Sequence, residues 1–508
     1  MTNKNLVLAA MVFAVAMTFI DQTIVAIAIP DLQNDLDLSQ TSSQWIINGY
    51  LLSLSALFAF GGKLGDVYGR RRMVQVGVIG FAAASACCGF APNGAVMIVF
   101  RVVQGAFAAV MFPAAVGVVV ASFPLRERGR AMAVFFGISG GLTAIGPIAG
   151  GFLTQWTWRS IFWINVPVAL IALWLIWRSK PDDTRYPTPL DMRGVALISG
   201  GMGLVVLGLQ QAGQWGWGAA QTWACLLAGL ALCVVFVVWE LRASHPLLNL
   251  RIFRDRGFAA ESVVLALMSV VFIPFFFFGS VYSQVSLGKN ASDAGLYIMW
   301  FFIGFVIAAQ IGGRILDRRG ARPTVVLGSA VGAVGFFLLA GRLTDLSLAH
   351  QRWSIVIAGA GLGFILGPAS TDAVNRAPSS SYSEVTGITQ TGRNFGASLG
   401  MALLGTVLID RSASTVRDAL IEHGVPREAA VSAASSFGSA GAGSGAPGGT
   451  PPEILHAVQV AFAEATQTVF YVMAAVMALN FLVAVLWLPR GRVEALEEEE
   501  PQAVAVAL

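Results

Sequence analysis

The sequence has 508 residues, of which 56% are hydrophobic and only 12% are charged, with a formal net charge of +4. A soluble domain of this length cannot hide so much apolar surface in one core, so the composition excludes ordinary soluble enzymes and predicts a membrane protein. The small net charge gives no indication of nucleic-acid binding.

Long apolar runs predict fourteen transmembrane helices. They lie at 6–29, 44–61, 73–91, 96–121, 131–153, 160–178, 193–212, 221–240, 257–279, 294–312, 323–341, 353–371, 385–409 and 460–488. The runs are continuous rather than alternating, which favours an all-α polytopic protein over a β-barrel. We interpret the first run as a retained span, because it is too long for a signal peptide and many spans follow it.

The positions of the basic residues predict the orientation of the chain. If the N-terminus lies in the cytoplasm, most Lys and Arg residues fall in cytoplasmic segments, and only Arg101 and Arg393 fall within spans. The positive-inside rule then places both termini in the cytoplasm, in agreement with an even number of spans. The abundance of Arg, Ala and Gly favours a bacterial source, and therefore the bacterial cytoplasmic membrane.

A basic loop occurs twice in the sequence. It reads GGKLGDVYGRRR at Gly61–Arg72 and GGRILDRRGAR at Gly312–Arg322, after the second and the tenth predicted spans. A repeat at corresponding loops predicts two related six-helix bundles. The alternative is a chance similarity between two basic loops.

This repeat divides the chain into four parts. We expect an N-terminal bundle at 1–180, an inserted helix pair with its flanking loops at 181–256, a C-terminal bundle at 257–488 and an acidic tail at 489–508. The C-terminal bundle is expected to contain a long outer loop at 410–459, whose centre is rich in Gly, Ser and Pro. The stretches RDALIEHG and EILHAVQVAFAEA on either side of this centre have a pattern compatible with amphipathic helices.

Further motifs accompany the repeated loop. They are DQTIVAIAIP (Asp21–Pro30), RVVQGAFAAVMFPAA (Arg101–Ala115), GGLTAIGPIAGG (Gly140–Gly151) and WRSIFWINVP (Trp158–Pro167). Together the motifs resemble the signatures of the major facilitator superfamily and, within it, of the fourteen-span drug:proton antiporters. The resemblance implies two six-helix bundles plus two inserted helices. It also implies proton-driven export of small amphiphilic compounds by alternating access, with the proton as the coupling ion and no other cofactor.

The resemblance also implies roles for individual residues. The repeated loops latch the bundles together on the cytoplasmic side, and the implied gate residues are Gly65, Asp66, Arg70, Arg71, Arg314 and Asp317. The motif in span 5 is typical of exporters, and its small residues and proline predict a bent, close-packed hinge at Gly141, Gly146, Pro147 and Gly150. For the loops, the alternative is that they only anchor the chain by their positive charge.

Charges inside the membrane need a partner or a water-filled cavity. Asp21 and Arg101 lie at similar depths from the outer side, so we expect them to meet. A carboxylate that is alternately paired and unpaired can carry protons, and the resemblance links Arg101 to proton transfer; the alternative is a static ion pair. Glu261 is a second candidate for proton coupling, or else an interfacial residue that pairs locally.

Polar residues recur at helical spacing along predicted span 13 and include Gln390, Arg393 and Asn394. A polar stripe facing lipid is unfavourable, so we expect it to line a substrate cavity together with Gln104 and Phe276. The alternatives are hydrogen bonds between helices for the polar stripe and lipid contact for Phe276. The mixture of acidic and basic candidates leaves the substrate charge open.

The function that these observations favour is export of small amphiphilic, drug-like compounds. The sequence contains no P-loop and no common hydrolase motif, so neither direct ATP drive nor an enzyme is expected. An exporter of a lipid or natural product, a uniporter and a membrane-embedded enzyme are the alternatives. The expected partners are drug-like substrates, protons and membrane lipids, with the chain acting as a monomer and holding no metal.

Overall fold

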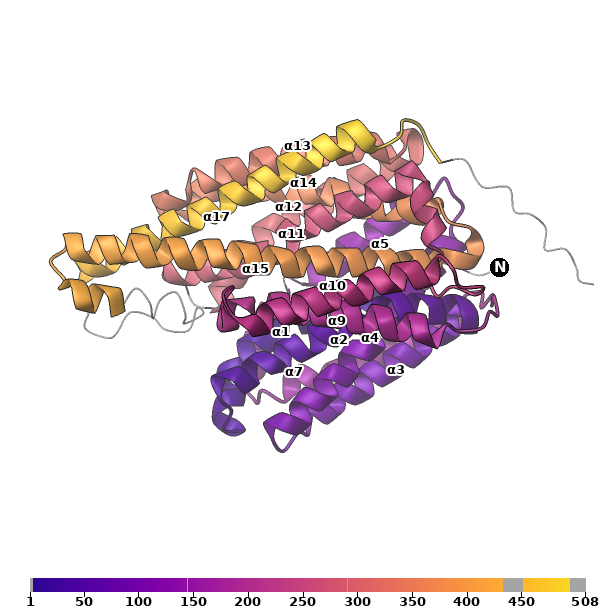
Figure 1. Ribbon diagram of the computed structural model, residues 1–508, viewed down its shortest axis with the longest axis horizontal. Coiled ribbons are helices and arrows are strands. Elements are labelled where there is room, and N and C mark those ends of the chain that lie inside the picture. Colours follow the sequence, from indigo (N-terminus) through magenta and orange to yellow (C-terminus); the bar gives the residue numbers. More distant parts are fainter. Residues whose placement is uncertain (1–2, 144, 290, 433–450, 494–508) are drawn as a thin grey trace, which may run out of the picture.

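The computed structural model describes residues 3–143, 145–289, 291–432 and 451–493. Every regular element within these ranges is a helix, as the continuous apolar runs predict. Thirteen helical segments are long and apolar enough to cross a membrane. Figure 1 shows the long helices running side by side along the longest axis of the molecule.

The N-terminal bundle precedes residue 180. Its helices are α1 (Lys4–Asp35), α2 (Gln40–Tyr68), α3 (Arg70–Gly89), α4 (Gly94–Ser122), α5 (Arg128–Leu142), α6 (Ile145–Thr154), α7 (Ser160–Trp163) and α8 (Asn165–Ser179). Helix α4 begins where the Asn93 side chain accepts a hydrogen bond from the Val96 N–H at 3.0 Å. The sharp junction of α2 and α3 is at Gly69, whose φ of 102° is accessible to glycine without strain.

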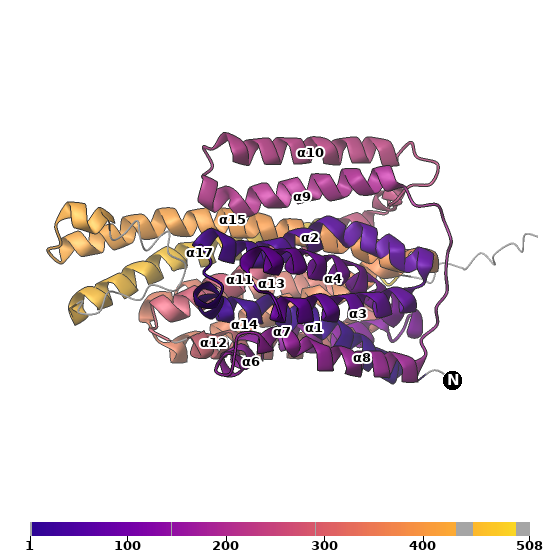
Figure 2. The same ribbon diagram turned by 90° about the horizontal axis from the view of Figure 1, so that it is seen from below.

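The C-terminal bundle follows an inserted pair of helices. The pair is α9 (Met192–Trp215) and α10 (Ala220–Glu240), and the bundle comprises α11 (Arg256–Val285), α12 (Ala291–Arg319), α13 (Ala321–Ala340), α14 (Leu348–Asn375), α15 (Tyr382–Glu422) and α17 (Pro452–Trp487). Three short 3-10 helices, η1 (Leu250–Arg254), η2 (Leu343–Asp345) and η3 (Ser379–Ser381), lie in the connections. Helix α9 packs against α2 and α15, and so against both bundles, whereas α10 lies outermost (Figure 2).

The predicted fifth span at 131–153 is not one continuous helix. The structure divides it into α5 and α6. Pro147 has no N–H with which to bond the carbonyl of Thr143, one helical turn before it. The hydroxyl of Thr23 on α1 donates to that carbonyl instead, at 3.0 Å. The side chain of Thr23 therefore replaces a missing helical hydrogen bond and ties the interrupted span to α1.

The outer segment 410–459 is helical at both ends, as the patterned stretches RDALIEHG and EILHAVQVAFAEA predict. Helix α15 continues to Glu422 and α17 begins at Pro452; the centre of the predicted loop, at 433–450, lies outside the described residues. The two helical extensions share a small apolar cluster, formed by Val416, Leu420, Ala430, Val458 and Ala461. These apolar contacts explain why the helices extend beyond the bundles (Figures 1 and 2).

Helices α12 and α14 approach closely through glycines. A Cβ atom on Gly304 would lie 1.9 Å from the Val356 carbonyl oxygen. We therefore expect Gly304→Ala to destabilise the protein by about 1–3 kcal/mol through overpacking, despite the higher helix propensity of alanine. Gly405→Ala, where nothing lies within 4 Å of the added Cβ, is the matched control. Thermal unfolding of both variants in detergent tests the prediction, which fails if the two melt alike.

Candidate functional site

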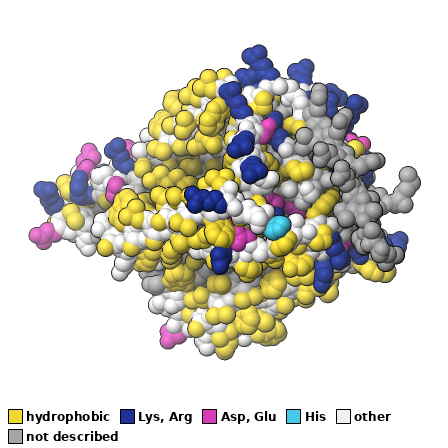
Figure 3. Space-filling view, turned by 45° about the vertical axis from the view of Figure 1, so that its right-hand side comes forward, with side chains coloured by type: hydrophobic (Ala, Val, Ile, Leu, Met, Phe, Trp, Pro, Cys, Tyr) yellow, Lys and Arg dark blue, Asp and Glu magenta, His cyan; other side chains and the backbone are white. Residues whose placement is uncertain are grey.

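The two basic loops, residues 61–72 and 312–322, lie at the same end of the molecule, which we call the basic end. Figure 3 turns this end forward and shows Lys and Arg side chains gathered around it. At this end Asp66 accepts hydrogen bonds from Arg70 Nε at 2.8 Å and Nη2 at 2.6 Å. The same carboxylate accepts the backbone N–H groups of Ser383 at 3.3 Å and Glu384 at 2.8 Å. Asp66 of one bundle therefore caps the first turn of α15 in the other.

The second copy of the loop makes the equivalent contact in the opposite direction. Asp317 on α12 accepts the backbone N–H groups of Gly129 at 2.8 Å and Arg130 at 3.0 Å, in the first turn of α5. Carboxylates at the positive end of a helix dipole are favourable. The repeat in the sequence therefore corresponds to a repeat in the structure, in which each bundle caps a helix of the other.

The remaining predicted gate residues differ in their contacts. Gly65 allows the bundles to approach, since a Cβ there would lie 3.0 Å from the Ser383 Cβ. The Nε atom of Arg71 is buried and has no hydrogen-bond partner among the residues that the structure describes. Arg314 is exposed, and no contact of its side chain joins the two bundles within the described residues.

Glu384 lies among the predicted gate residues, and the sequence analysis missed it. Its carboxylate pairs with Lys63 Nζ at 3.0 Å and accepts the backbone N–H of Asn249 at 2.6 Å. It thereby joins the first basic loop to the connection between α10 and α11. The signal available in the sequence was a carboxylate one residue before the predicted start of span 13, but its partners are more than a hundred residues away.

Asp21, Arg101 and Gln104 form one buried cluster on α1 and α4. Arg101 Nη1 donates to Asp21 Oδ2 at 2.6 Å and to Gln104 Oε1 at 2.7 Å. Gln104 Nε2 donates to Asp21 Oδ1 at 3.0 Å, and Arg101 Nε donates to the Ile46 carbonyl at 3.0 Å. Asp21 is 0% exposed and Arg101 1%. The predicted meeting of Asp21 and Arg101 is thus confirmed, and both charges are well supplied with partners.

The motif WRSIFWINVP holds the far end of α1. Trp158 Nε1 and Arg159 Nη1 donate to Asp35 Oδ2 at 3.0 and 2.6 Å. These hydrogen bonds, first that of Arg159 and then that of Trp158, hold the pKa of Asp35 below its ordinary value. Later in the motif, Asn165 donates to Ser85 Oγ at 2.9 Å. The contacts of this motif join helices of the N-terminal bundle.

The predicted hinge residues of span 5 lie at two interfaces. A Cβ on Gly146 would lie 2.0 Å from Thr23 Oγ1, so α6 needs a glycine to pack on α1. Gly141 faces the other bundle, where its Cβ would lie 3.6 Å from Val306 of α12. Gly150 is buried, and Pro147 lies in the first turn of α6, where a proline is tolerated. The side chain of Pro147 lies outside the described residues.

Glu261 on α11 is fully buried, and neither carboxylate oxygen has a hydrogen-bond partner in the described part of the chain. Asp372 and Arg376 of the same bundle act on it electrostatically, but Arg376 is engaged elsewhere. It pairs with Asp372 at 2.8 Å and with Asp255 at 3.1 Å. Glu261 is therefore enclosed by protein, and its carboxylate does not reach the molecular surface.

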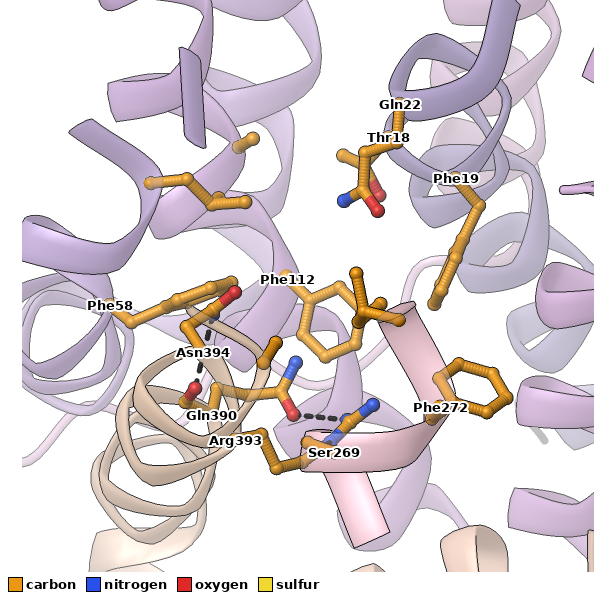
Figure 4. A pocket seen from close by; sticks show the side chains of 14 residues that line it. Thr18, Phe19, Gln22, Phe58, Phe112, Ser269, Phe272, Gln390, Arg393 and Asn394 are labelled. Carbon is orange, nitrogen blue, oxygen red and sulfur yellow. Dashed lines mark hydrogen bonds between the residues drawn. The ribbon is translucent and has the colours of Figure 1, made fainter. Parts of the chain in front are cut away.

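A cavity lies between the bundles, and both contribute to its walls. The N-terminal bundle supplies Thr18, Phe19, Gln22, Phe58 and Phe112, and the C-terminal bundle supplies Ser269, Phe272, Gln390, Arg393 and Asn394. Figure 4 shows these side chains facing the same space. The cavity volume is about 50 Å³ in this conformation, far below the roughly 300–1,000 Å³ of a drug-sized ligand pocket. A drug-sized ligand therefore requires the bundles to separate.

Two of the residues predicted to line the cavity lie elsewhere. Gln104 is 0% exposed and belongs to the Asp21–Arg101 cluster. Phe276 does not line the cavity; it stacks on Phe302 with ring centroids 5.2 Å apart and packs edge-on against Phe272. A single sequence predicts which residues share one face of a helix, but not which neighbouring helix that face contacts. This accounts for the wrong placement of both Gln104 and Phe276.

Comparison with known proteins identifies the fold family. A family model described as the Major Facilitator Superfamily matches residues 11–401. The chain belongs to the major facilitator superfamily. Its fold is similar to that of XylE, a proton:xylose symporter of this superfamily, with a TM-score of 0.63, 12% identity and 96% of each chain covered. The chain is therefore a polytopic membrane transporter and not an enzyme.

Two relatives illustrate the branch of this superfamily to which the chain is similar. The tetracenomycin C resistance and export protein of Streptomyces glaucescens is 35% identical over 448 residues, covering 88% of this chain and 83% of that protein. The multidrug resistance protein Stp of Mycobacterium tuberculosis (strain CDC 1551 / Oshkosh) is 30% identical over 514 residues, covering 96% and 94%. The resemblance to this superfamily inferred from the motifs is confirmed.

Proposed function

We propose that this transporter exports small amphiphilic, drug-like compounds across the bacterial cytoplasmic membrane in exchange for protons. The names of its relatives, which refer to antibiotic export and multidrug resistance, support the substrate class. The concentration of Lys and Arg at the basic end supports a cytoplasmic location for that end and for both termini. An exporter of a lipid or an endogenous natural product is the second candidate, because the same cavity would serve it.

The observation that carries the coupling proposal is the fully buried Asp21–Arg101 pair beside the cavity. Thr18 and Gln22, which line the cavity, lie on the same helix as Asp21, one within a turn and the other adjacent. A proton that binds Asp21 removes the carboxylate charge that Arg101 now neutralises. The guanidinium is then left uncompensated in a low-dielectric site, which favours a rearrangement of α1 against α4.

The gate at the basic end couples this local change to access. Asp66 and Asp317 hold the two bundles together at that end, each by capping a helix of the other bundle. Opening toward the cytoplasm requires these hydrogen bonds to break, and opening toward the outside allows them to persist. Rocking of the bundles around the cavity then gives alternating access.

Expression in a bacterium that lacks its own drug pumps tests the proposal. We expect lower accumulation of ethidium or a fluoroquinolone in cells that carry the transporter, and we expect a protonophore to abolish the difference. A difference that survives the protonophore would contradict proton coupling. Equal accumulation in cells with and without the protein, at demonstrated membrane expression, would favour a lipid or natural product as the substrate.

Glu261 is proposed as a second proton-binding group, since its carboxylate is buried without a hydrogen-bond donor. We expect Glu261→Gln to fold normally and to lower the number of protons moved per substrate by about one. The ratio can be measured from parallel proton and substrate fluxes in proteoliposomes. Glu428→Gln, at an exposed position of the outer segment, is the control. An unchanged ratio in Glu261→Gln would leave Asp21 as the proposed proton site by itself.

A further inference from the structure

Arg393 is the only charged side chain among the described residues that line the cavity between the bundles. It lies on α15 and is 8% exposed. Figure 4 shows it extended across the wall of the cavity, next to Gln390 and Ser269. No carboxylate lines the same space.

The positive charge of Arg393 is not neutralised by the protein. Its Nη1 donates to Gln390 Oε1, and its Nε lies 3.4 Å from Ser269 Oγ; both partners are neutral. Within the described residues it forms no ion pair, and its two hydrogen-bond partners carry no charge. A guanidinium has five N–H donors, so three of them have no partner here.

Arg101 provides a comparison within the same protein. It is buried even more completely, but it pairs with Asp21 at 2.6 Å and also donates to Gln104 and to the Ile46 carbonyl. A buried cation without a counter-charge is costly, and proteins keep such a group where a ligand supplies the anion. The two arginines therefore have different roles, and only Arg393 has free donors at the cavity.

Once the bundles separate, the rest of the cavity wall offers aromatic surfaces to a flat ring system. Phe19, Phe58, Phe112 and Phe272 contribute rings from four helices, and Phe58 and Phe112 meet edge-on with centroids 6.0 Å apart. Such rings bind planar apolar groups from several directions. The polar groups that accompany them, the Gln22 and Asn394 amides among them, can bond oxygen substituents on that body.

We propose that the substrates of this transporter are planar aromatic acids, whose carboxylate, phenolate or sulfonate binds the guanidinium of Arg393. The proposal rests on the proposed export function and names its substrate class. It resolves the substrate charge that the sequence left open, since the acidic residues Asp21 and Glu261 lie outside the cavity wall and Arg393 lies in it. Cationic compounds meet an unfavourable charge at this position.

Two dyes with the same three-ring xanthene core provide the test. Fluorescein is an anion in mildly alkaline buffer, and tetramethylrhodamine methyl ester is a cation. Binding of each to the full-length protein in phosphatidylcholine nanodiscs is followed by fluorescence anisotropy. We expect wild type to bind fluorescein about 10- to 100-fold more tightly than the cation, as hydrogen bonds to a charged group allow.

Three variants separate recognition from structure. Arg393→Gln is expected to lose the preference for fluorescein while it retains its affinity for the cation, and Arg393→Lys is expected to retain part of the preference. Arg352→Gln, which removes an exposed arginine outside the cavity, is expected to bind as wild type does. An equal loss of both dyes in Arg393→Gln, with a lower melting temperature, would assign Arg393 a structural role and overturn the proposal.

The remaining outcomes test the substrate class separately from the export function. Tighter binding of the cation by wild type would overturn the proposal, even if both dyes were exported from cells. Binding of fluorescein through Arg393 without export of either dye would support the proposal and contradict the export function. Competition by phosphatidylglycerol added to the nanodiscs would identify a lipid headgroup as the anion and would also overturn the proposal.

Discussion

Replacing Asp21 with Asn is expected to abolish proton-coupled transport and to destabilise the protein by about 3–5 kcal/mol. Asn has almost the same shape as Asp, but it carries no charge. The change therefore leaves Arg101, which is 1% exposed, without its ion-pair partner at 2.6 Å. Chemical unfolding measures the stability, and substrate-dependent proton flux in proteoliposomes measures the coupling.

The double variant Asp21→Asn with Arg101→Gln distinguishes a proton carrier from a static ion pair. Removal of both charges leaves no uncompensated ion, so we expect the stability to recover to within about 1 kcal/mol of wild type. Coupled transport is expected to stay absent, because the group that binds the proton is missing. Recovery of both stability and coupled flux in the double variant would show that the pair is only structural.

Replacing Asp66 with Asn is expected to open the gate at the basic end. The carboxylate accepts the Ser383 and Glu384 N–H groups and pairs with Arg70 at 2.6 Å. Because hydrogen bonds to a charged group contribute about 1.5–3 kcal/mol, we expect these two amides to exchange their hydrogens about 10- to 100-fold faster in the variant. We also expect export to fall by about tenfold, since the bundles close less often at this end.

Asp317→Asn is the natural comparison, because Asp317 caps α5 as Asp66 caps α15. Asp317 accepts the Gly129 and Arg130 N–H groups but forms no ion pair within the described residues. We therefore expect faster exchange at the first turn of α5 in this variant and a smaller loss of export. Unchanged exchange at both helix ends, measured by mass spectrometry of the intact transporter, would refute the gate.

The sequence predicted the helices and the repeat well because both follow from strong local signals. Long apolar runs locate membrane helices almost without regard to context. The equivalence of Asp66 and Asp317 was visible because each lies in a copy of the same loop. The pairing of Asp21 with Arg101 was also predictable, since two unlike charges at one depth in a membrane have few other partners.

The structure departs from the sequence prediction where a contact between distant segments decides the local structure. Pro147 marks the interruption of the predicted fifth span, but no pattern within residues 131–153 specifies Thr23 of α1, which bonds the Thr143 carbonyl. The apolar side chains of Val416 and Val458 pack in one cluster where α15 and α17 extend into the outer segment, and neither stretch specifies this pairing by itself. Gln104 and Phe276 have the residue types of a binding site, but their helices turn them toward other neighbours.

The most direct test of proton-coupled export is the pH inside liposomes that contain the purified transporter. With an inside-alkaline pH gradient imposed, a lumenal dye reports proton entry into liposomes loaded with buffer alone or with a fluoroquinolone, which carries a carboxylate on a planar ring system. The account predicts acidification that depends on the fluoroquinolone in wild type and is absent in Asp21→Asn and in protein-free liposomes. Acidification of equal rate in wild type and Asp21→Asn, with both proteins folded, would contradict it.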